Sequence, residues 1–281
     1  TQILESDVLA YYVWIPRYRY QIFYDGVNDT TKQLINIKFE SKETSKSLGT
    51  AKTEWLTHPA FTFGSDELDG IWVGKFEITG STTTPTIKPN VESLTNLNIN
   101  DLFYASKKIN YGTIRDTSII KNSEWGAVAY LTTSIYGQGL KEVSINTLLT
   151  TGGGAYDTQE GLLQSTTGNI SGIYDMSGGA NEYVMGIMES SLGSNIPISQ
   201  ISGVDIKYYD IYEYESSIGH LGDATNETKG WNDDYSYYLN SRSPWFRRGG
   251  DYGDRSSAGI FAFYNIDGSS YSHISTRVVL R

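Results

Sequence analysis

The sequence predicts one mixed α+β domain in which few elements are long. Two stretches have the 3, 4, 7 spacing of a helix that buries one face, and many short runs are rich in β-branched and aromatic residues. Turns of Gly, Asn and Ser separate these runs. We therefore expect two helices, short antiparallel strands and much irregular loop. The hydrophobic content of 38% is enough to fill a core.

The two helices are predicted to begin near residues 98 and 122. Asn98 is a suitable helix cap, and the stripe that follows it consists of Ile99, Leu102, Phe103, Ser106 and Ile109. The second stripe begins at Asn122 and has Glu124 in its first turn, where the helix dipole favours an anion. Its apolar members are Trp125, Val128 and Ala129. We expect this helix to end near Gly137.

The strand predictions are less regular. In the aromatic run 10–24, Pro16 separates two strand-like halves and indicates an edge hairpin or a crossover. Further strands are expected around Leu34–Phe39 and at 71–78, followed by a loop at 79–90. Three glycines at 152–154 are expected to form a flexible loop, because no Lys-Ser or Lys-Thr of a phosphate cradle follows them.

Charge and composition exclude several classes of partner. The formal charge of −10 disfavours nucleic acid and anionic membrane surfaces. No apolar run approaches the roughly 20 residues of a membrane span, so we expect no membrane insertion, and no signal peptide is visible in this chain. The absence of cysteine excludes disulfides, thiolate nucleophiles and Cys-based metal sites.

The stretch from Trp245 to Arg281 has the composition of a binding surface. From Gly249 to Thr276, 18 of 28 residues are Ser, Gly, Tyr, Asp or Asn, the mixture that paratopes use. In the alternating run 259–264, Phe261 and Phe263 are predicted to point inward, and Ile260, Ala262 and Tyr264 outward. We interpret the stretch as a buried frame that carries a displayed face, with the tyrosine-rich residues 208–238 beside it.

Four segments in order resemble the formylglycine-generating, sulfatase-modifying family, whose domain is an elaborated C-type-lectin fold. They are Val73–Thr79, Asn122–Tyr130, Ser171–Val184, and Arg248–Gly250 together with Thr276–Val279. The resemblance implies this fold for residues 55–281, with 1–54 as N-terminal strands packed on the same domain and 245–281 as the displayed tract. The family's catalytic Cys pair is absent, and His58, His220 and His273 are scattered. We therefore expect no catalytic residues and no enzyme activity; an oxidase relative with an iron or copper site remains the least favoured alternative.

The position of the tract, and the run Val13–Tyr18, resemble the variable proteins of diversity-generating retroelements, which include phage tropism determinants. This resemblance implies a non-enzymatic binder displayed on a virion tail or a cell surface, with a host receptor, protein or glycan, as its partner and no cofactor. A phage tail protein would also form a homo-oligomer such as a trimer. The implied ligand-binding residues are Asp251, Tyr252, Gly253, Asp254, Ser257, Ala262, Tyr264, Asn265, Ile266, Ser269, Tyr271, His273 and Ile274. Trp245 is an additional candidate, either as a binding anchor or as a core residue.

Several motifs admit a second interpretation. Trp231–Asp233 spells the WND of calcium-dependent lectins, and a calcium-dependent glycan-binding lectin is the alternative function, although a Trp packed under a polar turn is favoured. Asp251 and Asp254 are interpreted as turn residues rather than a glycosidase pair. Of Arg247 and Arg248, one is expected to be structural, while either could bind a carboxylate. Asn181 could border the face.

Overall fold

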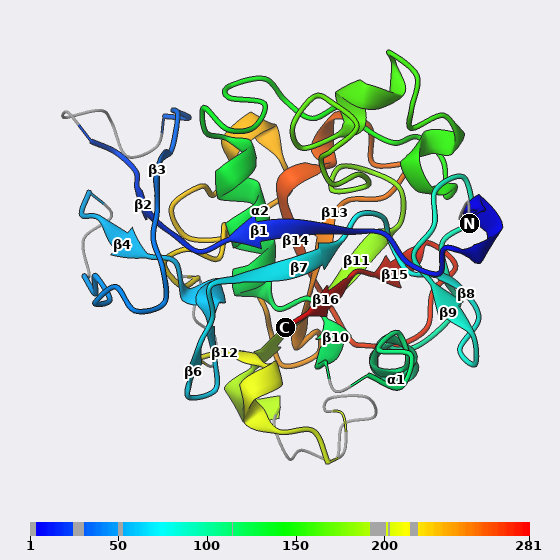
Figure 1. The fold of residues 1–281 in the computed structure, drawn as a ribbon. Helices are drawn as coiled ribbons and strands as arrows, with labels where there is room; N and C mark the ends of the chain where they lie inside the picture. Colours follow the sequence, from blue (N-terminus) through cyan, green and yellow to red (C-terminus); the bar gives the residue numbers. More distant parts are fainter. Residues whose placement is uncertain are drawn as a thin grey trace.

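The computed structural model describes residues 4–24, 31–49, 53–113, 115–191, 201, 203–213 and 219–281. Within these ranges, two α-helices accompany several small sheets, so the predicted α+β class is confirmed (Figure 1). Short 3-10 turns connect the elements; they span Glu5–Asp7, Pro59–Phe61, Thr151–Gly154, Gly161–Gln164, Glu189–Ser191, Ile206–Tyr208, Trp231–Asp233 and Arg255–Ser257.

The first sheet joins early and late parts of the chain. Its antiparallel strands follow the order β1-β7-β16-β10, and they are β1 (Tyr12–Pro16), β7 (Gly70–Gly74), β16 (Val278–Leu280) and β10 (Thr117–Ile119). Val73 pairs with both Val13 and Val279, and its side chain is buried. Trp14 and Trp72 pair on the outer face, where they are 40% and 42% exposed. The predicted strand at 71–78 ends at Gly74.

The second sheet is built around β11 (Asn181–Met188), all eight residues of which are buried. On one side it pairs antiparallel with β13 (Trp245–Gly249), which pairs with β14 (Gly259–Ile266). On the other side it pairs parallel with β12 (Asp210–Tyr212) and β15 (Ile274–Thr276). The expectation of antiparallel strands alone is therefore wrong for this sheet. Burial of β11 on both faces suits a strand with parallel neighbours.

In the described part of the chain, the remaining strands form three small sheets. β2 (Tyr18–Gln21) lies between β3 (Asn36–Phe39) and β4 (Leu56–Thr57). The chain thus leaves β1 after Pro16 and enters a different sheet, which makes the 10–24 run a crossover. Two hairpins pair β5 (Thr62–Phe63) with β6 (Asp66–Glu67), and β8 (Thr79–Gly80) with β9 (Pro85–Thr86). The second hairpin lies in the predicted loop 79–90, where Gly80, with φ of 83°, permits the turn.

Both helices begin where the sequence predicts. In α1 (Ile99–Lys108) the Asn98 side chain accepts a hydrogen bond from the Asp101 backbone N–H. In α2 (Asn122–Thr132) the Glu124 carboxylate accepts one from the Lys121 backbone N–H. α2 ends at Thr132 rather than near Gly137. Just after it, the Ser134 hydroxyl donates a hydrogen bond to the Leu131 carbonyl in place of a helical N–H, and turns follow. Among the described residues no helix is long and apolar enough to span a bilayer.

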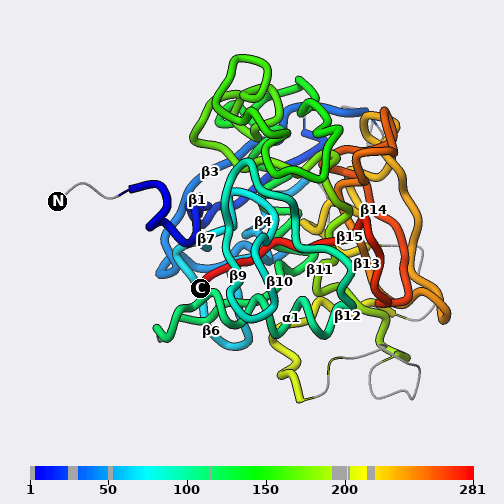
Figure 2. Tube along the Cα trace, turned by 90° about the vertical axis from the view of Figure 1, so that its right-hand side faces the viewer, coloured from blue at the N-terminus to red at the C-terminus, as the bar shows by residue number. Residues whose placement is uncertain are grey.

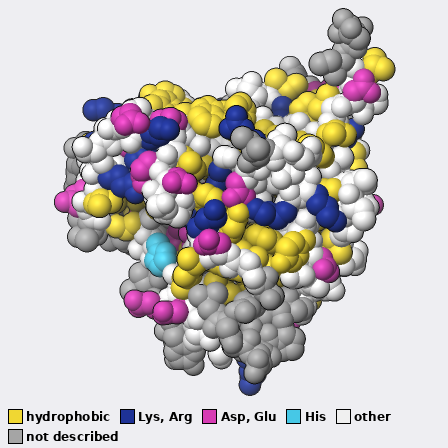
Figure 3. Space-filling model, turned by 60° about the horizontal axis from the view of Figure 1, so that its bottom comes forward, with side chains coloured by type: hydrophobic (Ala, Val, Ile, Leu, Met, Phe, Trp, Pro, Cys, Tyr) yellow, Lys and Arg dark blue, Asp and Glu magenta, His cyan; other side chains and the backbone are white. Residues whose placement is uncertain are grey.

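Two sides of the molecule are formed by different elements. The face around α1 and β12 carries interleaved basic, acidic and hydrophobic side chains (Figure 3), including Lys107 paired with Asp116 at 2.5 Å. β13, β14 and the loop that follows them run along another side, away from the 3-10 turn at Glu5–Asp7 (Figure 2). The C-terminal tract therefore occupies one flank of the fold.

Candidate functional site

The frame of the tract is the pair β13 and β14. Arg247 pairs with Tyr264 and Arg248 with Phe263, and the register shifts between Arg248 and Gly249. Phe261 and Phe263 are buried as predicted, but Ile260 and Ala262, expected to face outward, are also only 3% and 2% exposed. Other parts of the fold thus pack on both faces of β14, and residues 235–237 run parallel to it along its edge: the Phe263 N–H donates to the Tyr235 carbonyl, and the Tyr237 N–H donates to the Phe263 carbonyl.

Four of the residues proposed for ligand binding are therefore corrected to the core. Trp245 and Ile274 are fully buried, and Ala262 and Ile266 are 2% and 8% exposed. Trp245 packs against Tyr209 at 6.1 Å between ring centroids, which makes it a core residue and not an anchor for a ligand. Ala262 and Ile266 form the floor of hollows in the surface.

The other proposed residues reach the surface. Tyr252 and Gly253 are exposed, while the partly exposed ones are Asp251, Asp254, Ser257, Tyr264, Asn265, Ser269, Tyr271 and His273. They occupy the turn 250–258 and the stretch 264–273, which border the two hollows described below.

Arg248 fixes this frame from the interior of the fold. Its buried guanidinium donates to the carbonyls of Ala262 at 2.9 Å, Asp223 at 3.0 Å and Ala224 at 3.2 Å, and to the Asn122 side-chain oxygen at 2.8 Å. It therefore connects β14 to α2 and to the loop at 223–224. Burial lowers its pKa to about 10, and Asp223 opposes that shift.

A buried acidic group lies on β11, the strand that pairs with β13. Glu182 of β11 forms a 2.6 Å ion pair with Arg277, and both side chains are fully buried. Burial raises the pKa of Glu182 to about 7 although Arg277 favours the ionised form. Glu77 and Asp175 lie in the same electrostatic network, and burial raises the pKa of each. These side chains are buried in the fold and do not reach the displayed surface.

The turn at 251–254 is organised by its own carboxylates. Asp251 Oδ1 accepts from the Gly253 N–H at 2.7 Å, and Asp254 Oδ2 accepts from the Asp251 N–H at 3.0 Å. These bonds support the interpretation of both Asp residues as turn-forming. Asn181 donates to Asp251 Oδ2 at 3.1 Å, which ties the turn to the start of β11.

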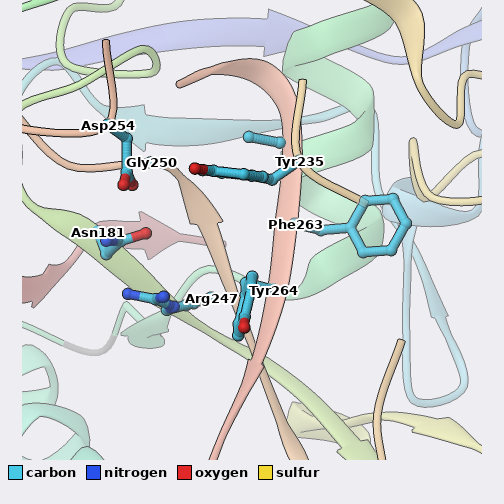
Figure 4. Close-up of a pocket in the computed structure, with 8 residues that line it drawn as sticks. Asn181, Tyr235, Arg247, Gly250, Asp254, Phe263 and Tyr264 are labelled. Carbon is cyan, nitrogen blue, oxygen red and sulfur yellow. The ribbon is translucent and has the colours of Figure 1, made fainter. Parts of the chain in front are cut away.

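The first hollow lies between this turn and β14 (Figure 4). It is lined by Asn181, Tyr235, Arg247, Gly250, Asp254, Ala262, Phe263 and Tyr264, and it encloses about 190 Å³ of empty space that includes open solvent. The Asp254 carboxylate and the Tyr235 hydroxyl lie at its upper edge, while the guanidinium of Arg247 extends toward Asn181 (Figure 4). This small notch presents a carboxylate and a guanidinium on opposite sides.

A second, wider hollow adjoins the first, since Arg247 and Tyr264 line both. Its other residues are Arg242, Ser243, Asn265, Ile266, Asp267, Tyr271 and His273. Asp267 accepts from the Ser269 N–H at 2.9 Å and from the Tyr271 hydroxyl at 3.2 Å. Burial, together with Asp267, raises the pKa of that hydroxyl.

Tyrosines flank these hollows. Tyr237 packs on Tyr264 with ring centroids 4.5 Å apart, and Tyr235 lies 6.3 Å from the same ring. Part of the tyrosine-rich stretch 208–238 thus lies beside the tract. Tyr208, Tyr209 and Tyr212 are instead buried under other elements, and Tyr214 lies outside the described residues.

The ligand-binding residues predicted from the sequence did not include Tyr235, Tyr237, Arg242 or Asp267. The density of tyrosines before the tract was the signal for the first two. For Arg242 and Asp267 only their position next to the candidate residues could have served.

The WND motif has a structural environment. Trp231 is buried and packs on Phe23 and Phe261 at 6.2 and 5.3 Å. The side-chain oxygen of Asn232 accepts a 2.5 Å hydrogen bond from the Lys32 ammonium. A Trp packed under a polar turn, as favoured from the sequence, describes this segment.

The three histidines lie in three different surroundings. His58 is fully buried beside Tyr18, His220 stacks on Tyr212 at 4.4 Å, and His273 lies near Tyr271. Over the described ranges, no group of three or more His, Asp or Glu is arranged to hold a metal ion.

Comparison with known proteins finds a similarity among solved structures. No protein-family model matches the sequence, and no curated protein matches it. Among solved structures, Treponema denticola variable protein 1 is similar to this chain with a TM-score of 0.36 and 14% sequence identity, over 76% of this chain and 86% of that chain.

Proposed function

We propose that this chain is a non-enzymatic ligand- or receptor-binding protein. Its ligand meets the face formed by the turn 251–254, the stretch 264–273 and the tyrosines at 235 and 237. One observation carries the proposal: polar and aromatic side chains of the tract reach solvent, while the strands that carry them are buried and fixed by Arg248. Substitutions at such exposed positions typically change stability by less than about 0.5 kcal/mol. The face is therefore free to vary with its ligand.

The finer assignment rests on the sequence resemblances. We propose that the domain is a C-type-lectin-fold variable protein diversified by a retroelement and displayed on a phage tail tip or a cell surface, where it binds a host receptor. Several copies, as in a trimer, would raise a weak affinity by about 10² to 10⁴ through multivalency. Flanking DNA that contains neither a reverse transcriptase gene nor a near-copy of the segment encoding the tract would contradict the retroelement assignment and leave the binding proposal intact.

Binding is tested with two matched double variants. The face variant is Tyr252→Ala with Tyr271→Ala, and the control is Tyr104→Ala with Tyr136→Ala, since these two tyrosines are 46% and 49% exposed and belong to neither hollow. Each protein is applied to arrays of glycans and cell-surface proteins. We expect the wild-type chain and the control to capture the same ligand and the face variant to lose it. Equal capture by both variants would contradict the proposal.

A further inference from the structure

Two adjacent arginines on β13 have opposite environments. Arg248 is buried and fully engaged with carbonyls. The Arg247 guanidinium lies over the Tyr264 ring, 4.7 Å from its centroid. Within the described residues it forms no ion pair, and its Nε, although buried, has no hydrogen-bond partner. A buried donor without an acceptor is unfavourable, and the same guanidinium belongs to a residue that lines both hollows.

The second hollow has more basic than acidic side chains, whereas the chain as a whole is acidic. Arg242 lines the second hollow with Arg247, is exposed, and in the described part of the chain its guanidinium has no acidic partner. In contrast, Arg17, Arg19, Arg277 and Arg281 all form ion pairs. In a chain with a charge of −10, two unpaired arginines in one hollow indicate an anionic ligand group. A guanidinium fork binds a carboxylate through two parallel hydrogen bonds.

The same hollow also presents acceptors and ring faces. Asp267 faces it with a carboxylate, and Asn265 and Ser243 add neutral polar groups. Asp267 would repel a densely charged polyanion, but it suits a ligand that has hydroxyl donors beside a single carboxylate. Tyr264 and Tyr271 provide rings against which the C–H face of a sugar can pack.

We propose that this hollow binds a carboxylate-bearing sugar. The carboxylate of the sugar binds Arg247 and also Arg242, which lies at the rim of the hollow. The sugar ring lies against Tyr271, and its hydroxyls donate to Asp267. This inference rests on the proposed binding function and names the chemical class of its ligand.

The test uses the whole chain and three small probes: glucuronate, glucose and acetate at equal ionic strength. Glucuronate and glucose differ only in the carboxylate at one carbon. Calorimetry measures affinity, and the NMR signal of the Arg247 Nε–H reports where the probe binds. We expect glucuronate to shift that signal saturably and to bind about tenfold or more tighter than glucose, since a hydrogen bond to a charged group contributes about that factor. Acetate is expected to shift the same signal with lower affinity, because it lacks the ring.

Two variants give a matched comparison. Arg247→Gln should abolish the preference for glucuronate. Arg255→Gln removes the same charge from an exposed residue of the tract that lines neither hollow, and it should leave the preference unchanged. Equal losses in both variants would show a nonspecific charge effect and overturn the proposal.

Other outcomes separate this inference from the function on which it rests. If blocked glutamate binds as tightly as glucuronate, Arg247 binds acidic peptides and the sugar proposal is overturned. If glucuronate does not bind but the Tyr252 and Tyr271 variant loses its array ligand, the binding function stands and this inference fails. If glucuronate binds Arg247 but both double variants capture an array ligand equally, the binding function proposed for the face fails instead.

Discussion

The carboxylate of Asp234 accepts a hydrogen bond from the Phe261 backbone N–H at 2.9 Å. Its other oxygen is buried and has no hydrogen-bond partner in the described part of the chain. Burial raises the pKa of Asp234 to about 7; Glu142 adds to the shift, while the Phe261 N–H, Lys32 and Arg248 oppose it. Asp234 thus fastens the 231–238 segment to β14, and its proton is held more tightly in the folded chain than in the unfolded one.

We predict that stability falls as pH rises toward neutrality. The ordinary pKa of Asp234 is 3.8 and the folded value is about 7. Between these values the folded chain holds a proton that the unfolded chain has released, so the free energy of unfolding decreases with pH and levels off above about 7. One such group gives a slope of at most about 1.4 kcal/mol per pH unit. Glu182, also raised to about 7, adds slope of the same sign.

Asp234→Asn should flatten this dependence, because Asn keeps the acceptor for Phe261 and cannot ionise. Urea denaturation between pH 5 and pH 8 measures the slope. Asp233→Asn is the control, since Asp233 is adjacent and exposed, and it should leave the slope as in the wild type. Identical slopes in wild type and Asp234→Asn would refute the role assigned to Asp234.

Gly259 is predicted to tolerate no side chain. A Cβ there would lie 2.2 and 2.3 Å from the two carboxylate oxygens of Asp234. Gly259→Ala must therefore displace the Asp234 clamp, and we expect a loss of about 1–3 kcal/mol, as for overpacked cores. Gly253→Ala is the comparison, since its Cβ would meet only the flexible Asp251 carboxylate at 3.1 Å. Denaturation midpoints should fall clearly for the first variant and little for the second.

The two arginines of β13 should respond differently to the same change. Arg248→Lys leaves several carbonyls without their donor, and we expect a loss of at least about 3 kcal/mol, typical of a broken buried network. Arg247→Lys keeps the charge at a partly exposed position and should change stability by less than about 0.5 kcal/mol. Thermal unfolding of both variants decides the matter. Similar losses would mean that Arg247 is part of the frame rather than of the face.

Much of the fold follows from local sequence signals. Asn98 and Glu124 mark the two helix starts because capping depends on residues within one turn. The Pro16 crossover is also a local effect, because proline restricts the backbone. The parallel pairing of β12 and β15 with β11 could not be predicted, since partner and direction depend on long-range contacts that leave no local pattern.

The site was predicted in outline and corrected in detail. Alternation in β14 predicted that Ile260 and Ala262 face solvent, but both are buried in the fold. Burial by a segment from elsewhere in the sequence cannot be seen in a strand's own period. The same limit applies to Trp245, for which core and anchor were equally weighted. Arg247 and Arg248 could be told apart only once the strand had a buried and an open side.

The last prediction concerns Arg281 and the start of α2. Its guanidinium donates to both carboxylate oxygens of Glu124 at 2.6 Å, and both side chains are buried. Arg281→Ala would leave Glu124 buried and without its cation, which costs about 3–5 kcal/mol. Lys42→Ala, which breaks a 3.8 Å pair with Asp69 in which both side chains are about half exposed, should cost at most about 1 kcal/mol. The double variant Glu124→Gln with Arg281→Met should recover part of the loss, because it leaves no unpaired charge in the core. Urea titration at low and high salt tests this: the Arg281 effect should persist in salt, since buried pairs are weakly screened, and an effect no larger than that of Lys42→Ala would mean that the pair adds nothing to the stability of α2.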